Sequence, residues 1–220
     1  HTRITLLRMF KDAGYIVEEE ILIASDFGVP QRRKRYFIIG LLKPKAELSF
    51  LPERNGQVEL TAGDVLRSFP PPGEPGNERT INAKITTAAS PVMRRSPYAG
   101  MLFNGLGRPI DLSRPVQTLA ATFGGNKTPI VDERELREGA NPWIVEYHSQ
   151  LKEGLIPVYG EAPSFLRRLT VDESIVLQGF PRDYKFQGPK SSQFRQIGNS
   201  VPPGLAFAVA KQLAKHLNSN

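Results

Sequence analysis

The pattern of apolar and polar residues is regular at both ends of the chain and broken in the middle. Near the start, apolar residues at helical spacing fill residues 4–13, and Gly14 follows as a helix-ending glycine. Two runs rich in aromatic and β-branched residues, 15–24 and 35–42, predict strands, with residues 26–34 as the loop between them. A helix and two strands are part of an α/β sheet, but they are too few to enclose a core.

Regular patterns return in the last quarter of the chain. Thr170 and Glu173 have capping-box spacing, and the apolar residues after them predict a helix that ends at Gly179. The last helix opens with Pro202 and Pro203 and carries a one-sided apolar stripe. The stripe consists of Leu205, Ala206, Val209, Ala210, Leu213 and Leu217. We expect this stripe to pack on the strands near the start, so that both ends of the chain form one domain.

The middle of the chain predicts turns and short extended segments. Residues 43–165 contain most of the 19 prolines and many of the 19 glycines. One short helix is expected over residues 62–68, because Thr61 and Asp64 have capping-box spacing. A loop-rich insertion on a rigid scaffold is a common place for molecular recognition.

The composition is that of a globular protein without thiol or metal chemistry. Apolar residues make up 40% of the 220 residues, and no apolar run approaches the roughly 18 residues of a membrane span. The start, His1-Thr-Arg-Ile-Thr, does not have the form of a signal peptide. The chain has no Cys, and its three His residues lie far apart. We therefore expect no disulfide, no thiol nucleophile, no metal site and no contact with a membrane.

The charge of the chain favours a polyanionic partner. The net charge is +7, and Lys and Arg outnumber Asp and Glu in residues 1–45 and 166–220 but not in residues 46–165. A basic balance at both ends is typical of proteins that bind nucleic acid, although charge alone is a weak indication.

Four consecutive basic residues, Arg32 to Arg35, lead directly into the strand-like residues Tyr36 to Ile39. This arrangement fixes the charges at the end of a sheet. Guanidinium groups held there suit phosphate or a polarised carbonyl oxygen, because each offers paired planar donors and keeps its proton. A solvated basic patch is the alternative reading of an isolated run of this kind.

A second candidate segment spans residues 113–129. Gly124 and Gly125 allow the backbone to approach a ligand or to adopt a positive φ, and Asn126 and Lys127 stand beside them. A hairpin turn explains the two glycines equally well.

Three segments together resemble the C-terminal half of the DNA cytosine-5 methyltransferases, especially those of bacterial restriction-modification systems. Gly28-Val-Pro-Gln31-Arg-Arg33-Lys-Arg35 resembles the eighth conserved motif of the family. Arg168-Leu-Thr170-Val-Asp-Glu173, which runs on to Leu177-Gln-Gly-Phe-Pro181, resembles the ninth. Gln196-Ile-Gly-Asn199-Ser200-Val-Pro-Pro203 resembles the tenth. Between the eighth and ninth, Gln117-Thr118-Leu119 and Phe123-Gly-Gly125 are similar to the Thr-Leu dipeptide and glycine loop of the target recognition domain.

The resemblance implies an α/β fold: the C-terminal part of a Rossmann-like, S-adenosylmethionine-dependent domain with a loop-rich α+β target recognition domain inserted. Residues 1–45 would be C-terminal strands of the catalytic domain, and residues 46–165 the recognition domain. Residues 166–220 would contain the ninth-motif helix and the final helix, which return to the catalytic domain. The expected location is the bacterial cytoplasm, in association with the nucleoid.

The resemblance also implies a role for individual residues. The catalytic set, Gln31, Arg33 and Arg35, would face the flipped cytosine and its flanking phosphates, with Arg35 near the base oxygen. Asn199 and Ser200 would border the S-adenosylmethionine pocket, in addition to a role as a helix cap. The residues implied to bind double-stranded DNA are Arg32, Thr118, Leu119, Gly124, Gly125 and Lys127. Arg168 and Glu173 would brace the recognition domain.

The residues that start the reaction are not in this sequence. The family needs a Cys thiolate that attacks the base, a Glu on the cytosine edge and a glycine-rich turn for the methyl donor, which is bound mainly by the N-terminal half. The sequence contains no Cys, so we expect the chain to be inactive without an N-terminal catalytic half or subunit. It is then the second subunit of a split enzyme, a fragment of a longer product, or a relic that binds DNA. A non-catalytic DNA-binding module remains the alternative function.

Overall fold

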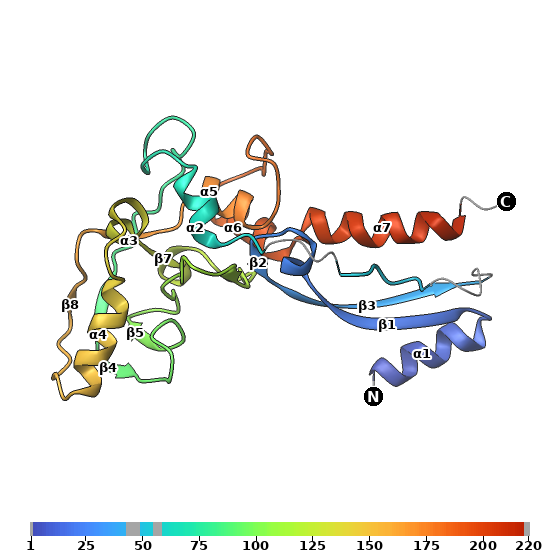
Figure 1. The fold of residues 1–220 in the computed structure, drawn as a ribbon, viewed down its shortest axis with the longest axis horizontal. Helices are drawn as coiled ribbons and strands as arrows, with labels where there is room; N and C mark the ends of the chain where they lie inside the picture. Colours follow the sequence, from blue (N-terminus) through green and yellow to red (C-terminus); the bar gives the residue numbers. More distant parts are fainter. Residues whose placement is uncertain (1, 43–48, 55–58, 218–220) are drawn as a thin grey trace.

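The computed structural model describes residues 2–42, 49–54 and 59–217 and shows an elongated molecule (Figure 1). At one end, helices α1 and α7 flank the two long strands β1 and β3, and both chain termini lie there. Shorter helices and strands form the other end. Among the helices of the described residues, none has both the length and the apolar character needed to cross a membrane.

The first part begins with the helix and two strands that the sequence predicts. Helix α1 (Thr2–Asp12) is followed by Gly14, which has a φ of 85° and allows the chain to reverse. Strands β1 (Ile16–Ile23) and β3 (Lys34–Leu41) pair antiparallel along their full length. The short 3-10 helix η1 (Ala24–Phe27) follows β1 and leads into the loop before the basic run.

Helix α7 (Pro203–Leu217) packs on this pair of strands, as predicted. Leu205 and Val209 are buried in one cluster with Leu22 of β1 and Ile39 of β3. Leu213 and Ala208 are partly buried against the same cluster. Among the stripe residues whose burial the structure describes, Ala206 and Ala210 are exposed, so the buried face of α7 differs from the predicted stripe there.

The second part has a core around three helices: α2 (Ala62–Arg67), α5 (Val171–Leu177) and α6 (Lys190–Asn199). Capping boxes start α2 and α5, as the Thr61 and Thr170 patterns predict. Helix α6 was not predicted, because Phe194 and Ile197 are its only two large apolar residues. The core also contains residues from the middle of the chain. Helices α5 and α6 thus pack against the inserted module, whereas α7 packs on β1 and β3.

Short strands extend this second part. Strand β4 (Thr86–Val92) lies between β5 (Met101–Phe103) and β8 (Gly160–Glu161), and β7 (Ile130–Asp132) pairs with β9 (Leu166–Arg168).

The prediction that the middle of the chain has little regular structure was wrong for two helices. Helix α3 (Glu133–Glu138) is capped by the Asp132 side chain and ends at Gly139, which has a φ of 69°. Helix α4 (Trp143–Lys152) starts after Pro142 and buries Ile144 and Tyr147 beneath the small sheet. The surrounding prolines and glycines are helix boundaries here, and they hid the helical spacing between them.

Candidate nucleic-acid interface

The basic run and the Thr-Leu segment lie side by side. Strand β2 (Gln31–Arg32) pairs in parallel with β6 (Val116–Gln117), and Val116 N donates to Pro30 O at 3.0 Å. Thr118 Oγ1 donates to Arg32 O at 3.2 Å. We call residues 116–120 the β6 segment. The pairing brings together two motifs that are far apart in the sequence.

Two side chains of the expected catalytic set, Gln31 and Arg33, form hydrogen bonds to the main chain of the β6 segment. Gln31 and Arg33 have exposed fractions of 0% and 1%. Gln31 Oε1 accepts from Leu119 N at 3.2 Å, and Arg33 Nη1 donates to Leu119 O at 2.8 Å. Arg33 Nη2 also donates to Gly198 O at 2.5 Å. In this structure the Gln31 amide and both terminal nitrogens of Arg33 therefore bind protein, whereas Arg33 Nε is buried without a partner. The expectation that the two side chains face a base stays a prediction.

Gln178 continues this buried network toward the end of α6. Gln31 Nε2 donates to Gln178 Oε1 at 2.7 Å, and Gln178 Nε2 donates to Ser200 Oγ and Ser200 O, both at 3.0 Å. Buried amides are costly without partners, so this chain of bonds fixes the relative positions of the β6 segment and the Asn199–Ser200 corner. The sequence analysis quoted Gln178 only as part of a motif and assigned it no role.

Asn199 and Ser200 lie at the end of α6, not at the start of α7. Ser200 is the C-cap residue, and its hydroxyl donates to Ile197 O at 2.7 Å. The cap role therefore concerns the preceding helix. Asn199 is exposed, and its side-chain amide has no hydrogen bond to the described residues, so its expected place at the methyl-donor pocket stays a prediction.

Arg35 is the member of the expected catalytic set that is accessible. It is partly exposed on β3, where its Nη1 donates to Lys34 O at 2.8 Å. Desolvation by burial lowers the pKa of its guanidinium, which still remains protonated near neutral pH. Arg35 thus presents a cation near the start of β3, three residues after the strand that pairs with β6.

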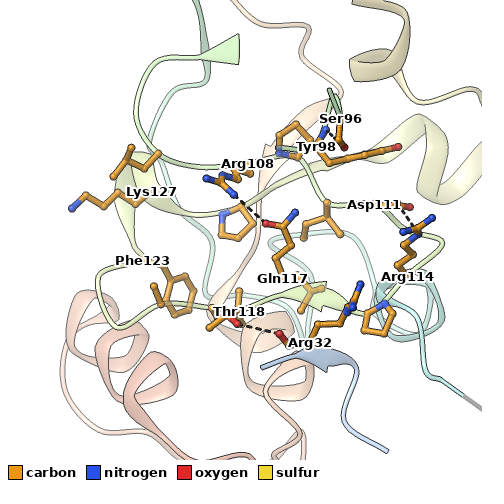
Figure 2. Close-up of a pocket in the computed structure, with 18 of the residues that line it drawn as sticks. Arg32, Ser96, Tyr98, Arg108, Asp111, Arg114, Gln117, Thr118, Phe123 and Lys127 are labelled. Atoms are coloured by element: carbon orange, nitrogen blue, oxygen red, sulfur yellow. Dashed lines mark hydrogen bonds and ion pairs between the residues drawn. The ribbon is translucent and has the colours of Figure 1, made fainter. Parts of the chain in front are cut away.

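Residues of the β6 segment line a pocket of about 410 Å³ (Figure 2). Four of the residues expected to bind DNA line it: Arg32, Thr118, Leu119 and Lys127. Two further cations, Arg108 and Arg114, also line it. The carboxylate of Asp111 lies 3.6 Å from Arg114 Nε, so one of the four cations is offset. A concave surface with this excess of positive charge suits a phosphate backbone.

Gly124 and Gly125 turn the chain into the 3-10 helix η2 (Gly125–Lys127), which is not a hairpin. Their φ angles are 134° and 52°, so both glycines are required by the backbone conformation. A side chain at Gly124 would lie 3.7 Å from Phe194, while Gly125 faces open space. The turn places Lys127 at the pocket, and it leaves space beside the backbone at Gly125 for a ligand.

Arg168 and Glu173 bind protein groups, and their expected bracing role stays a prediction. Arg168 Nη1 donates to Thr128 O at 2.8 Å, and burial lowers the pKa of Arg168 to about 10. Glu173 is fully buried, where it accepts from Arg167 Nη2 at 2.7 Å and from Asn77 Nδ2 at 3.2 Å. These bonds attach α5 and β9 to the inserted module. Within the described residues, no group of acidic, His or Cys side chains could hold a metal ion.

The sequence motifs assign no role to the two pocket arginines, Arg108 and Arg114. Arg114 lies in the candidate segment 113–129, whereas Arg108 lies outside every motif, in a loop-rich stretch where any cation reads as solvated. Arg108 contacts the β6 segment through its bond to Gln117, which local spacing does not reveal.

Comparison with known proteins supports the resemblance. The family model for C-5 cytosine-specific DNA methylases matches residues 1–215. The type II methyltransferase M1.HphI of Haemophilus parahaemolyticus is 30% identical over 224 residues, which cover 100% of this chain and 53% of that protein. The type II methyltransferase M.NgoPII of Neisseria gonorrhoeae is 30% identical over 226 residues, which cover 96% of this chain and 59% of that protein. The chain thus spans little more than half the length of these relatives.

Solved structures share the fold. The S. pombe Dnmt2 methyltransferase superposes with a TM-score of 0.61 at 16% identity, covering 97% of this chain and 61% of that one. The Entamoeba histolytica methyltransferase EhMeth gives a TM-score of 0.58 at 15% identity, with coverage of 98% and 58%. The mixed α/β fold is therefore that of a methyltransferase. With nearly its whole length matched by the family model, the chain belongs to the C-5 cytosine-specific DNA methylase family.

Proposed function

We propose that this chain is the target-recognition and C-terminal part of a DNA cytosine-5 methyltransferase. One observation carries the proposal: the cationic pocket includes the β6 segment, and β6 pairs with β2, the short strand that ends three residues before Arg35. A duplex held in the pocket would therefore be in register with a cation at the reacting base. The sequence specificity of the enzyme would reside in this chain.

Arg35 would act on the base itself. Attack of a thiolate at C6 of cytosine pushes electron density toward the base oxygen, and a preorganised cation at that oxygen stabilises the developing charge. S-adenosylmethionine would supply the methyl group for C5 when bound, with the free amide of Asn199 at the edge of its pocket. Because the 220 residues contain no Cys, the thiolate would come from a Cys-bearing portion outside this sequence.

The other residues of the resemblance divide into two groups. Gln31 and Arg33 would act as positioning residues, since both bind the main chain of Leu119 and so hold the β6 segment against residues 31–33. Arg32 and Lys127 would bind phosphates, while Thr118 and the turn at Gly125 would approach the base edges or support the loop that does.

The proposal is tested by combining the chain with a Cys-bearing N-terminal portion of the same family and following labelled methyl groups into duplex DNA. We expect incorporation at cytosine C5 only when both portions are present. An Arg35→Lys variant is the matched control, because it keeps the charge but loses the planar donors. Binding of the chain to DNA, with no incorporation in any matched combination, would instead favour a DNA-binding module without catalytic function.

A further inference from the structure

Arg108 is held on a rigid piece of backbone at the rim of the pocket. A Cβ atom at the preceding residue, Gly107, would lie 2.2 Å from both Arg168 Nη1 and Thr128 O, so only glycine fits there. On the other side, Arg108 O accepts from Ile130 N at 2.9 Å. The buried Arg168 side chain and strand β7 therefore fix the main chain from which Arg108 projects.

The side chain of Arg108 is exposed, and a neutral group rather than a carboxylate orients it. Its Nη1 donates to Gln117 Oε1 at 3.3 Å, and it forms no ion pair within the described part of the chain. Figure 2 shows the two side chains meeting over the pocket, with Lys127 on one side of Arg108. Arg114, in contrast, lies beside the carboxylate of Asp111. Arg108 thus keeps its full charge and most of its donors for a ligand.

The hydrogen-bonding groups of Arg108 are all donors. Its Nη1 donates to Gln117 Oε1, which leaves the other guanidinium donors for a ligand. In the major groove, guanine presents two acceptors, N7 and O6, whereas adenine presents one acceptor and one donor. A guanidinium, which has no acceptor, therefore matches guanine and cannot pair with the adenine amino group.

We infer that Arg108, oriented by Gln117, reads a guanine of the target sequence through the major groove. This inference rests on the proposed function, because it identifies which residues of the same pocket carry base specificity. Lys127 and Arg32, which flank the pair, contact phosphates and set the register. Arg108 comes from the loop before β6 and Gln117 from β6 itself, so the reading pair forms only when the inserted module is folded.

The test is the selection of duplexes from a random-sequence library by the chain and by its Arg108→Ala variant. We expect the selected sequences to share a G·C pair that becomes degenerate in the variant, while the other positions are retained. Preference for guanine at that position should fall roughly 5- to 150-fold, the range for one bidentate contact. Arg114→Ala is the matched control: it removes a cation of the same pocket and should leave the selected sequence unchanged. Gln117→Leu should weaken the same position without affecting the others.

The outcomes separate this inference from the proposed function. If the unaltered chain selects a sequence that Arg108→Ala leaves intact, or if the degenerate position is an A·T pair, the reading pair is overturned and the proposed function stands. If the unaltered chain selects no common sequence, the proposed function falls, and the reading pair falls with it. Circular dichroism of each variant checks the fold, because the replacement of an exposed side chain should leave the fold unchanged.

Discussion

Replacing Gly198 by alanine tests how closely helix α6 is packed against the β6 segment. Gly198 is the second-last residue of α6, and a Cβ atom there would lie 2.4 Å from Ala120 O and 2.7 Å from the Cα atom of Ala121. These are backbone atoms, which cannot rotate away as the end of a flexible side chain can. Either the helix or the segment must move, and with it the two carbonyl groups that Arg33 binds.

Two effects of opposite sign decide the result. Overpacking a well-filled contact costs about 1–3 kcal/mol of folding free energy. Alanine in place of glycine in a helix gives back at most about 1 kcal/mol, and less near a helix end. With a return of about 0.5 kcal/mol at this helix end, we expect Gly198→Ala to lower the free energy of unfolding by about 0.5–2.5 kcal/mol, the difference between these effects. If α6 did not touch the segment, the helix propensity alone would make the variant more stable.

The sign can be read from thermal unfolding. For a chain of this size, each kcal/mol shifts the melting temperature by about 2–4 °C, so a decrease of a few degrees is expected. Gly160→Ala is the matched control, since the atom nearest to its added Cβ is Thr87 Oγ1 at 3.9 Å. DNA binding should weaken in Gly198→Ala and not in the control. A melting temperature of Gly198→Ala equal to or above that of the unaltered protein would refute the packing argument.

Three further predictions concern charge. Arg35→Ala should lower the rate of methyl transfer by the combined enzyme about 10²–10³-fold, as the loss of an oxyanion donor does. The DNA sequence preference should stay intact. Loss of this preference with turnover retained would assign Arg35 to recognition. Lys127→Ala should weaken binding to every duplex alike and reduce the slope of log K against log salt by about 1 in a salt titration, whereas an unchanged slope would exclude a phosphate contact. Desolvation, and then the charges of Asp132 and Asp111, raise the pKa of Glu135 from 4.5 to about 7. The folded state therefore keeps a proton that the unfolded state releases, so the contribution of Glu135 to stability falls as pH rises from about 4.5 to 7. The melting temperature of Glu135→Gln, relative to that of the unaltered protein, should increase over this pH range. A difference in melting temperature that does not change with pH would contradict the raised pKa.

Features of the fold set by local chemistry were predictable from the sequence. The capping boxes at Thr61 and Thr170 start helices as expected, because the capping side chain and its partner are three residues apart. The packing of α7 on β1 and β3 also follows from its apolar stripe. Helix α6 escaped prediction since two large apolar residues do not make a periodic pattern.

The basic run illustrates what the sequence could not reveal about the site. Arg32 and Lys34 are exposed while Arg33 is buried, so the run alternates as a strand does. A run made only of cations hides this alternation, because all its members look equally suited to solvent. Arg33 can be buried because the carbonyl groups of Leu119 and Gly198 meet it, and both come from segments remote in sequence.

The central claim is that this chain supplies the DNA-reading surface and Arg35 but not the nucleophile. A duplex with 5-fluorocytosine at the target position tests it directly. Release of the thiolate from C6 requires loss of the proton at C5, and fluorine at C5 prevents this elimination. The base then stays covalently attached to the protein. After the duplex is incubated with the chain, the Cys-bearing portion and S-adenosylmethionine, we expect an adduct on the Cys-bearing portion that forms only when this chain is present. An adduct on this chain, or one that forms equally well without it, would contradict this division of roles.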